Sequence, residues 1–389
     1  MERLSLGFGI SYWLEKLVFC LATLVSIYTW LKSVDFTPDS TNYIVAGKNL
    51  LQFHQFFVYT NWPSYSLDLQ IEPFTDFPPG FSILFAGFLF LAKNLYLAII
   101  ASQITYIVLF YASFAYFFHV LQIRKNIRIV FWIIIPLFLP FIGIFQFYLS
   151  ETVFIAISLL IGSLCLSPHF QCKFNRARFW IILALILVSS SIRFMGVLNC
   201  LWIFTPLFLA NIPRKSKLVF ILPVLIASFA APMLWFVRNH LQYGLATKSH
   251  AIGSIFLAEH LLTPFDFLLW TPYGILGAIL ASVFFIGLVF CIKTFPLYLR
   301  SEHISLKEKH ASLTASLTTP MTAPLTTPLT TYKTLVILLI VNFLFVLLVS
   351  LFAHINALDG RLLSPAFSIA LVLVAFILSH LWGINKPFF

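Results

Sequence analysis

Long apolar stretches recur along this chain and restrict it to a helical membrane fold. A helix needs about 20 apolar residues to cross the hydrocarbon core of a bilayer, and only helices or closed barrels satisfy their backbone groups there. The sequence is 60% hydrophobic and only 10% charged, which excludes an ordinary soluble domain. Predicted spans cover residues 13–32, 96–120, 129–148, 152–167, 178–192, 194–212, 218–237, 272–293, 334–353 and 363–383. We therefore predict an all-α, polytopic transmembrane bundle of about 10 or 11 spans.

One further apolar stretch, Gly80–Ala92, is too short to cross a bilayer comfortably. It follows Pro78 and Pro79, which favours a re-entrant or tilted segment. Such a segment is tolerated only where protein covers its backbone. If it does cross, the next helix reverses direction and the sidedness predicted below fails.

The basic composition is explained by topology. The chain has a net charge of +11, which by itself would be compatible with a nucleic-acid partner. With the N-terminus in the cytoplasm, however, most of the 24 Lys and Arg fall on the cytoplasmic side and most of the 13 acids on the other side. We therefore expect no nucleic-acid partner. We expect a multi-pass protein surrounded by membrane lipids, in a bacterial inner (plasma) membrane, with an extracytoplasmic active face and a retained first span.

The sequence indicates a single membrane domain over residues 1–389 with two notable loops. The first extracytoplasmic loop, 33–94, is long enough to hold structure. After Asp39 and Ser40, either of which would serve as a helix cap, apolar residues from Tyr43 to Leu51 recur at helical spacing and predict a surface helix. The cytoplasmic loop 294–333 contains a Thr/Pro/Leu repeat with the composition of a disordered linker.

Residues 35–80 hold a cluster of carboxylates beside the first span, namely Asp35, Asp39, Asp68, Glu72 and Asp76. Charged groups are expensive at membrane depth, so such a cluster marks a working surface. The predicted threading brings further polar residues from separate spans to the same face. The candidate residues are Asp39, Glu151 and Asp76 as catalytic carboxylates, Arg193, Arg238 and Arg361 as phosphate ligands, and Asp35 and Tyr43 as supporting residues.

Carboxylates and arginines at one membrane face suit group transfer from a lipid phosphate. A carboxylate can act as general base towards a hydroxyl nucleophile. Arginine binds phosphate bidentately and stabilises it as a leaving group. The five cysteines form no CxxC pair and the ten histidines show no ligand spacing. No cofactor is required by the sequence; a divalent cation stays possible and its identity unknown.

A series of short motifs occurs in a fixed order along the chain, namely Pro38-Asp39-Ser40, Tyr43, Ala46, Asn49-Leu50-Leu51, Pro78-Pro79-Gly80, Ser150-Glu151, Arg193, Arg238-Asn239, and Arg361 with Pro365. Together these motifs resemble the GT-C superfamily of polytopic glycosyltransferases, in the branch of the protein mannosyltransferases and aminoarabinose transferases (glycosyltransferase family 39-like). The resemblance runs from the first span to about residue 240 and resumes near residue 359.

The resemblance implies an inverting transferase that takes one sugar from a polyprenyl-phosphate carrier to an extracytoplasmic hydroxyl. Carried over, Asp39 is the general base or a metal-supporting carboxylate, Glu151 the acid of the second outer loop, and Arg193 a ligand of the donor phosphate. Many relatives have Asp-Glu where this chain has Asp39-Ser40, which weakens the case for a metal. The acceptor stays open between a lipid, a glycan and a protein.

Each candidate also has a structural alternative. Asp39 could cap the surface helix, Asp35 could pair with an arginine, and Asp76 could be a turn residue. Glu151 could gain about 0.3–1 kcal/mol from the helix dipole after an N-cap at Ser150. Asp359 and Arg361 could form a local ion pair. The alternative function is a transporter or flippase for a lipid-linked or anionic substrate, although no inverted repeat is detected.

Overall fold

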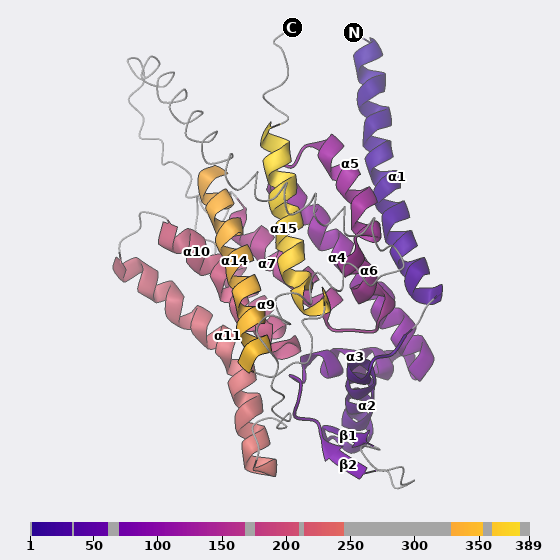
Figure 1. Cartoon of the computed structure of the whole chain (residues 1–389), viewed down its shortest axis with the longest axis vertical. Helices are drawn as coiled ribbons and strands as arrows, with labels where there is room; N and C mark the ends of the chain where they lie inside the picture. The colour runs from indigo at the N-terminus through magenta and orange to yellow at the C-terminus, as the bar shows by residue number, and fades with distance from the viewer. Residues whose placement is uncertain are drawn as a thin grey trace.

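The computed structural model describes residues 2–32, 35–60, 70–167, 176–209, 214–244, 328–352 and 360–381. Its elements are α1 (Glu2–Lys32), α2 (Pro38–Phe53), β1 (Phe57–Thr60), β2 (Gln70–Pro73), α3 (Gly80–Ala92), α4 (Leu95–Val120), α5 (Lys125–Ile134), η1 (Ile135–Leu137), α6 (Leu139–Gln146), α7 (Glu151–Leu166), α9 (Arg176–Ile192), η2 (Phe194–Cys200), α10 (Leu201–Leu209), α11 (Arg214–Tyr243), α14 (Pro328–Phe352) and α15 (Gly360–Leu381). The long helices form a bundle with the start of α1 and the end of α15 at one end and α2, β1 and β2 at the other (Figure 1).

The helical membrane bundle predicted from the sequence is confirmed. Among the described residues, three helices are long and apolar enough to cross a bilayer, at Trp13–Lys32, Leu95–Val120 and Phe220–Tyr243. Further apolar helices, including α7 and α15, are shorter. The predicted span at 272–293 and most of the loop at 294–333 lie outside the described residues, although α14 begins before the predicted start of its span.

Two predicted spans are wrong as continuous helices. The stretch 129–148 divides into α5, the 3₁₀ turn η1 and α6, with Pro136 and Pro140 in the first turns of the two later pieces. Proline lacks the backbone N–H that a helix interior needs, so the helix restarts at each of them. The stretch 194–212 likewise begins with seven residues of 3₁₀ helix before α10.

The first outer loop forms the end of the bundle that contains α2, β1 and β2. α2 and α3 cross at close range, because a Cβ on Gly47 would lie 2.7 Å from the Ser82 carbonyl oxygen. α3 has 13 residues, which gives it a length of about 20 Å and leaves it short of a bilayer core. Its re-entrant placement therefore stays a prediction.

A two-stranded antiparallel hairpin, which the sequence pattern did not predict, covers α2. β1 pairs with β2 in a register that sets Phe57 opposite Pro73. The side-chain amide of Asn49 on α2 donates to the Phe57 carbonyl oxygen at 2.9 Å. This contact joins the hairpin to the helix that carries Asp39 and Tyr43.

A bidentate ion pair joins α1 to α5. Arg128 donates through Nε and Nη2 to the two carboxylate oxygens of Glu15, at 2.6 and 2.9 Å. The predicted threading places both residues on the cytoplasmic side, and this contact agrees with a shared side.

Candidate functional site

An ion pair joins the start of α7 to the end of α9. Glu151 is the first residue of α7, and Arg193 follows the last residue of α9. Arg193 Nη1 lies 2.6 Å from Glu151 Oε1, and the two side chains are 16% and 6% exposed. A buried charge without a partner is destabilising by several kcal/mol, so Glu151 and Arg193 each need the other. The ion pair therefore compensates two buried charges at this end of the bundle.

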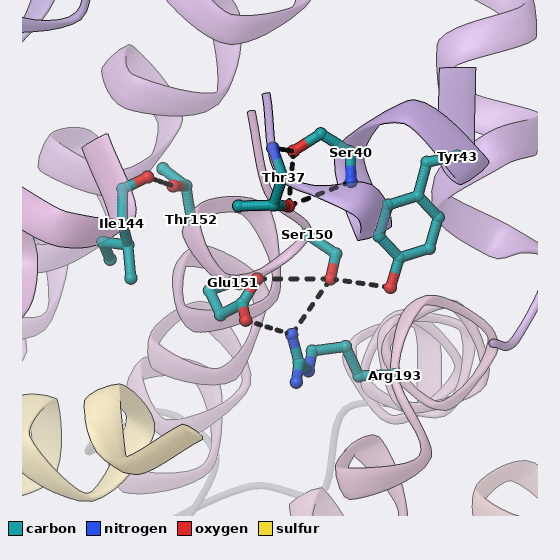
Figure 2. Close-up of polar contacts among 8 residues, drawn as sticks. All are labelled: Thr37, Ser40, Tyr43, Ile144, Ser150, Glu151, Thr152 and Arg193. Carbon is teal, nitrogen blue, oxygen red and sulfur yellow. Dashed lines mark hydrogen bonds and ion pairs between the residues drawn. The ribbon is translucent and has the colours of Figure 1, made fainter. Parts of the chain in front are cut away.

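Ser150 connects this ion pair to α2. Arg193 Nη1 donates to Ser150 Oγ at 3.1 Å, and Ser150 Oγ donates to Glu151 Oε2 at 3.5 Å. The hydroxyl of Tyr43 lies 3.5 Å from the same Oγ. Figure 2 shows these three contacts converging on the serine hydroxyl. Ser150 occupies the N-cap position of α7 but makes no side-chain cap bond, so the expected capping role is wrong and its hydroxyl belongs to the site.

Tyr43 closes the site on the side of the first outer loop. Its side chain is buried, and its ring packs against Phe77 and Phe81 with centroid distances of 5.0 and 4.9 Å. Burial, the largest influence, raises the pKa of the Tyr43 phenol well above its usual range. The phenol therefore stays protonated across physiological pH and can act as a hydrogen-bond donor.

Asp39 lies one helical turn before Tyr43, near enough for its charge to act on Arg193. Asp39 is not the N-cap of α2, as one expectation had it, because that position is Thr37, and Ser40 takes part in the cap from the third helical position. Thr37 Oγ1 accepts the Ser40 N–H at 3.1 Å, and Ser40 Oγ accepts the Thr37 N–H at 3.2 Å. This reciprocal capping box satisfies the helix end without the Asp39 carboxylate.

Asp76 lies in the bend that leads into α3. Its Oδ1 is buried and has no hydrogen-bond partner among the described residues. A buried carboxylate oxygen without a partner is unusual and needs an explanation. The next residue, Phe77, packs against Tyr43, so Asp76 belongs to the same end of the bundle as the ion pair.

Arg238 occupies a separate aromatic setting on α11. Its guanidinium lies over the rings of Trp235, Tyr243 and Phe56, at 4.7, 5.1 and 5.9 Å from their centroids. It also donates to Asn239 Oδ1 at 2.8 Å. Within the described part of the chain, none of the contacts of Arg238 involves the central ion pair, so the structure does not bring this predicted phosphate ligand to Arg193.

The positions of two other candidates, Asp35 and Arg361, are known from the backbone elements in which they lie. The Asp35 side chain is exposed, and its backbone N–H lies 3.5 Å from the Gln146 carbonyl oxygen. The described residues include no ion pair to Asp35, in contrast with the expected arginine partner. Arg361 lies in the first turn of α15, and its expected pairing with Asp359 lies outside the described residues.

Two glycines hold the chain where Arg193 leaves α9. A Cβ on Gly196 would overlap the backbone of Ser189 and Ser190, and a Cβ on Gly80 would lie 2.5 Å from the Ser191 carbonyl carbon. The start of α3 and the turn of η2 therefore pack directly on the last turn of α9. Sequence reasoning missed this role, although the sequence shows Gly80 after Pro79 and Gly196 three residues after Arg193.

The close contact of Gly196 with the backbone of α9 leads to a prediction about stability. Gly196→Ala places a methyl group against backbone that cannot move aside, and overpacking of this kind costs about 1–3 kcal/mol. We expect a lower unfolding temperature in detergent for this variant. Gly143→Ala is the matched control, since a Cβ there meets nothing within 4 Å and the change should be neutral or stabilising. Equal unfolding temperatures for the two variants would contradict the packing argument.

The described residues contain no group of three His, Cys, Asp or Glu side chains close enough to hold a metal ion. What they bring together is a carboxylate–guanidinium pair, a serine hydroxyl and a protonated phenol, with a second carboxylate nearby. Among the described residues, the side chain of Arg193 has partners only at Nη1. Its other nitrogens have none among the described residues and so can donate to an oxyanion.

Comparison with known proteins gives one structural match. No known family profile matches the chain, and neither does any curated protein. The chain is similar in fold to a crystal structure of ArnT from Cupriavidus metallidurans in the apo state, with a TM-score of 0.46 and 12% sequence identity. The match covers 97% of this chain and 77% of the ArnT chain.

Proposed function

We propose that this protein is an integral membrane glycosyltransferase that moves a sugar from a polyprenyl-phosphate donor to an extracytoplasmic acceptor hydroxyl with inversion. The observation that carries the proposal is the Glu151–Arg193 pair, bridged by Ser150 to the helix that bears Asp39. It combines an arginine with unused donors, suited to a phosphate, with a nearby carboxylate suited to a base. The motif resemblance supports the same assignment.

In the proposed reaction, the acceptor hydroxyl attacks the anomeric carbon while Asp39 takes its proton. The new bond joins the acceptor oxygen to that carbon, and the bond from the carbon to the phosphate oxygen breaks. Polyprenyl phosphate leaves with the bonding electron pair, and Arg193 stabilises its added negative charge. Attack opposite the leaving group inverts the anomeric configuration.

Glu151 receives a positioning role in this proposal. Its Oε1 is engaged by Arg193 and its Oε2 by Ser150, so the Glu151 carboxylate is already charge-paired and is a weak base. Asp76, with one unpartnered buried oxygen, is the second candidate for the base. Arg238 and Arg361 remain candidates for more distant parts of the donor phosphate or its sugar.

The test is sugar transfer by the full-length protein reconstituted in vesicles. A panel of polyprenyl-phosphate sugars is supplied with lipid, glycan and peptide acceptors, and release of polyprenyl phosphate is measured. We expect release coupled to a product of inverted anomeric configuration. Movement of an intact donor across the vesicle without cleavage would instead support the transporter alternative, and a product of retained configuration would contradict the mechanism.

Ser150→Ala tests the bridging hydroxyl. The substitution removes the contacts to Arg193, Glu151 and Tyr43 but keeps the ion pair. Because a hydrogen bond to a charged group contributes about 1.5–3 kcal/mol, we expect kcat/KM for the donor to fall by roughly 10- to 100-fold. Ser163→Ala on the same helix is the matched control, since among the described residues that hydroxyl donates to the Leu159 carbonyl of its own helix and to nothing else. Similar losses in both variants would indicate a structural effect alone.

A further inference from the structure

A groove between the end of α1 and the start of α4 is distinct from the site described above. It has a volume of 480 Å³ and is lined mainly by apolar side chains, including Trp30, Phe36, Tyr96 and Ile99. That volume is within the range of about 300–1,000 Å³ typical of small-molecule pockets. None of the lining residues belongs to the ion pair or its bridge. The groove is therefore a candidate binding site separate from the ion pair.

Trp30, one of the residues that line the groove, has an unused hydrogen-bond donor. Trp30 is fully buried, and its indole Nε1 has no hydrogen-bond partner among the described residues. Indole N–H groups normally find a partner when buried. An occupant with an acceptor oxygen would supply that partner in an otherwise apolar setting.

The rim of the groove is apolar, aromatic and flanked by lysines. Phe36 and Tyr96 are exposed at 47% and 71%. Lys32 and Lys93, both exposed, are next in sequence to the lining residues Leu31 and Asn94. Asp35, which is also exposed, is a negatively charged residue close to Lys32 in the sequence. Exposed aromatic rings with lysines at helix ends are typical of the membrane–water interface, where the lysine heads meet lipid headgroups.

We infer that this groove binds an anionic phospholipid of the surrounding bilayer. One acyl chain occupies the apolar floor, an ester or phosphate oxygen accepts the Trp30 N–H, and the phosphate lies between Lys32 and Lys93. A bilayer phospholipid fits better than the substrate lipid because no residue of the candidate site lines the groove. The inference depends on membrane insertion and is independent of the transferase proposal.

The bound lipid would also support the entry to α2. Phe36 lines the groove and directly precedes Thr37, the N-cap of the helix that carries Asp39. At no more than about 3.6 Å per residue, Asp39 lies within about 11 Å of Phe36 along the chain. A lipid packed against Phe36 would therefore restrict the segment from which α2 starts.

The inference is tested by native mass spectrometry of the full-length, delipidated protein titrated with phosphatidylglycerol or with phosphatidylcholine of the same acyl chains. We expect wild-type protein to prefer phosphatidylglycerol. Lys32→Gln and Lys93→Gln should each weaken its binding about fivefold and leave phosphatidylcholine unchanged. Trp30→Phe should weaken both lipids by roughly three- to tenfold. Lys48→Gln, an equal charge change on α2, is the matched control.

Two results would overturn the inference. One is equal binding of the two phospholipids that none of the three groove variants alters. The other is displacement of phosphatidylglycerol, molecule for molecule, by polyprenyl phosphate, which would assign the groove to the substrate lipid. The lysine variants change only exposed side chains, so they keep the test valid even if Trp30→Phe fails to fold.

Discussion

Asp39→Asn is expected to lower kcat for sugar transfer by about 10²- to 10⁴-fold, the usual contribution of a positioned general base. Asparagine keeps the shape of the side chain but cannot take the acceptor proton. The fold should survive, because Thr37 and Ser40 cap α2. The measurement is the initial rate of polyprenyl phosphate release at saturating donor, with expression and unfolding temperature matched to the wild type.

Glu72→Gln is the control for Asp39→Asn, since it removes a carboxylate from the same outer segment and lies on β2. It should retain wild-type turnover. Unchanged turnover in Asp39→Asn would remove Asp39 from the mechanism. Asp76→Asn then becomes the deciding variant, because the buried Oδ1 of Asp76 has no hydrogen-bond partner among the described residues.

Arg193→Ala is expected to be the most damaging single substitution for stability. It leaves Glu151 as a buried charge without its partner, and breaking such a pair costs about 3–5 kcal/mol. Arg193→Lys separates stability from function, because lysine keeps the positive charge and loses the planar fork that holds a phosphate. We expect Arg193→Lys to fold and to lose about 10²- to 10³-fold in transfer rate, as when an oxyanion donor is removed.

Arg128→Lys is the matched control for Arg193→Lys. Arg128 also pairs with a glutamate at 2.6 Å, but it joins α1 to α5, away from the candidate site. The control should leave the transfer rate unchanged. If both lysine variants transfer sugar at the wild-type rate, Arg193 is a structural residue and the phosphate must be held elsewhere. Thermal unfolding of Arg193→Ala against Glu151→Ala, with the double variant, measures the coupling within the pair.

The sequence predicted the site best where charge was costly. Arg193 stands between two apolar stretches, and a cation is kept in such a place only with a partner. Glu151 starts an apolar span, and alternation of spans predicts that it faces the same side as Arg193. Both inferences use only the length of a membrane helix and the free-energy cost of a buried charge, so they do not require knowledge of how the side chains pack.

The sequence predicted least well the features that depend on close backbone contact. Ser150 was expected to be a helix cap. The neighbouring sequence does not distinguish a serine that caps its own helix from one that accepts a hydrogen bond from a distant arginine. The prolines at 136 and 140 divide a stretch whose hydropathy alone suggests one span. Phe56, the residue before β1, packs on Trp235 of α11 with the two ring centroids 5.2 Å apart, so the start of the hairpin depends on a contact between segments far apart in the chain.

By itself, then, the amino-acid order determined that this protein is a helical membrane bundle with carboxylates and arginines gathered at one end. Hydropathy and charge act through solvent and lipid, which every residue meets wherever the rest of the chain lies. The tertiary structure alone decided that Glu151 is the carboxylate that pairs with Arg193. Close packing of distant segments is part of the same decision, because Gly80 and Gly196 allow α3 and η2 to pack on the last turn of α9, where a Cβ at either position would overlap its atoms.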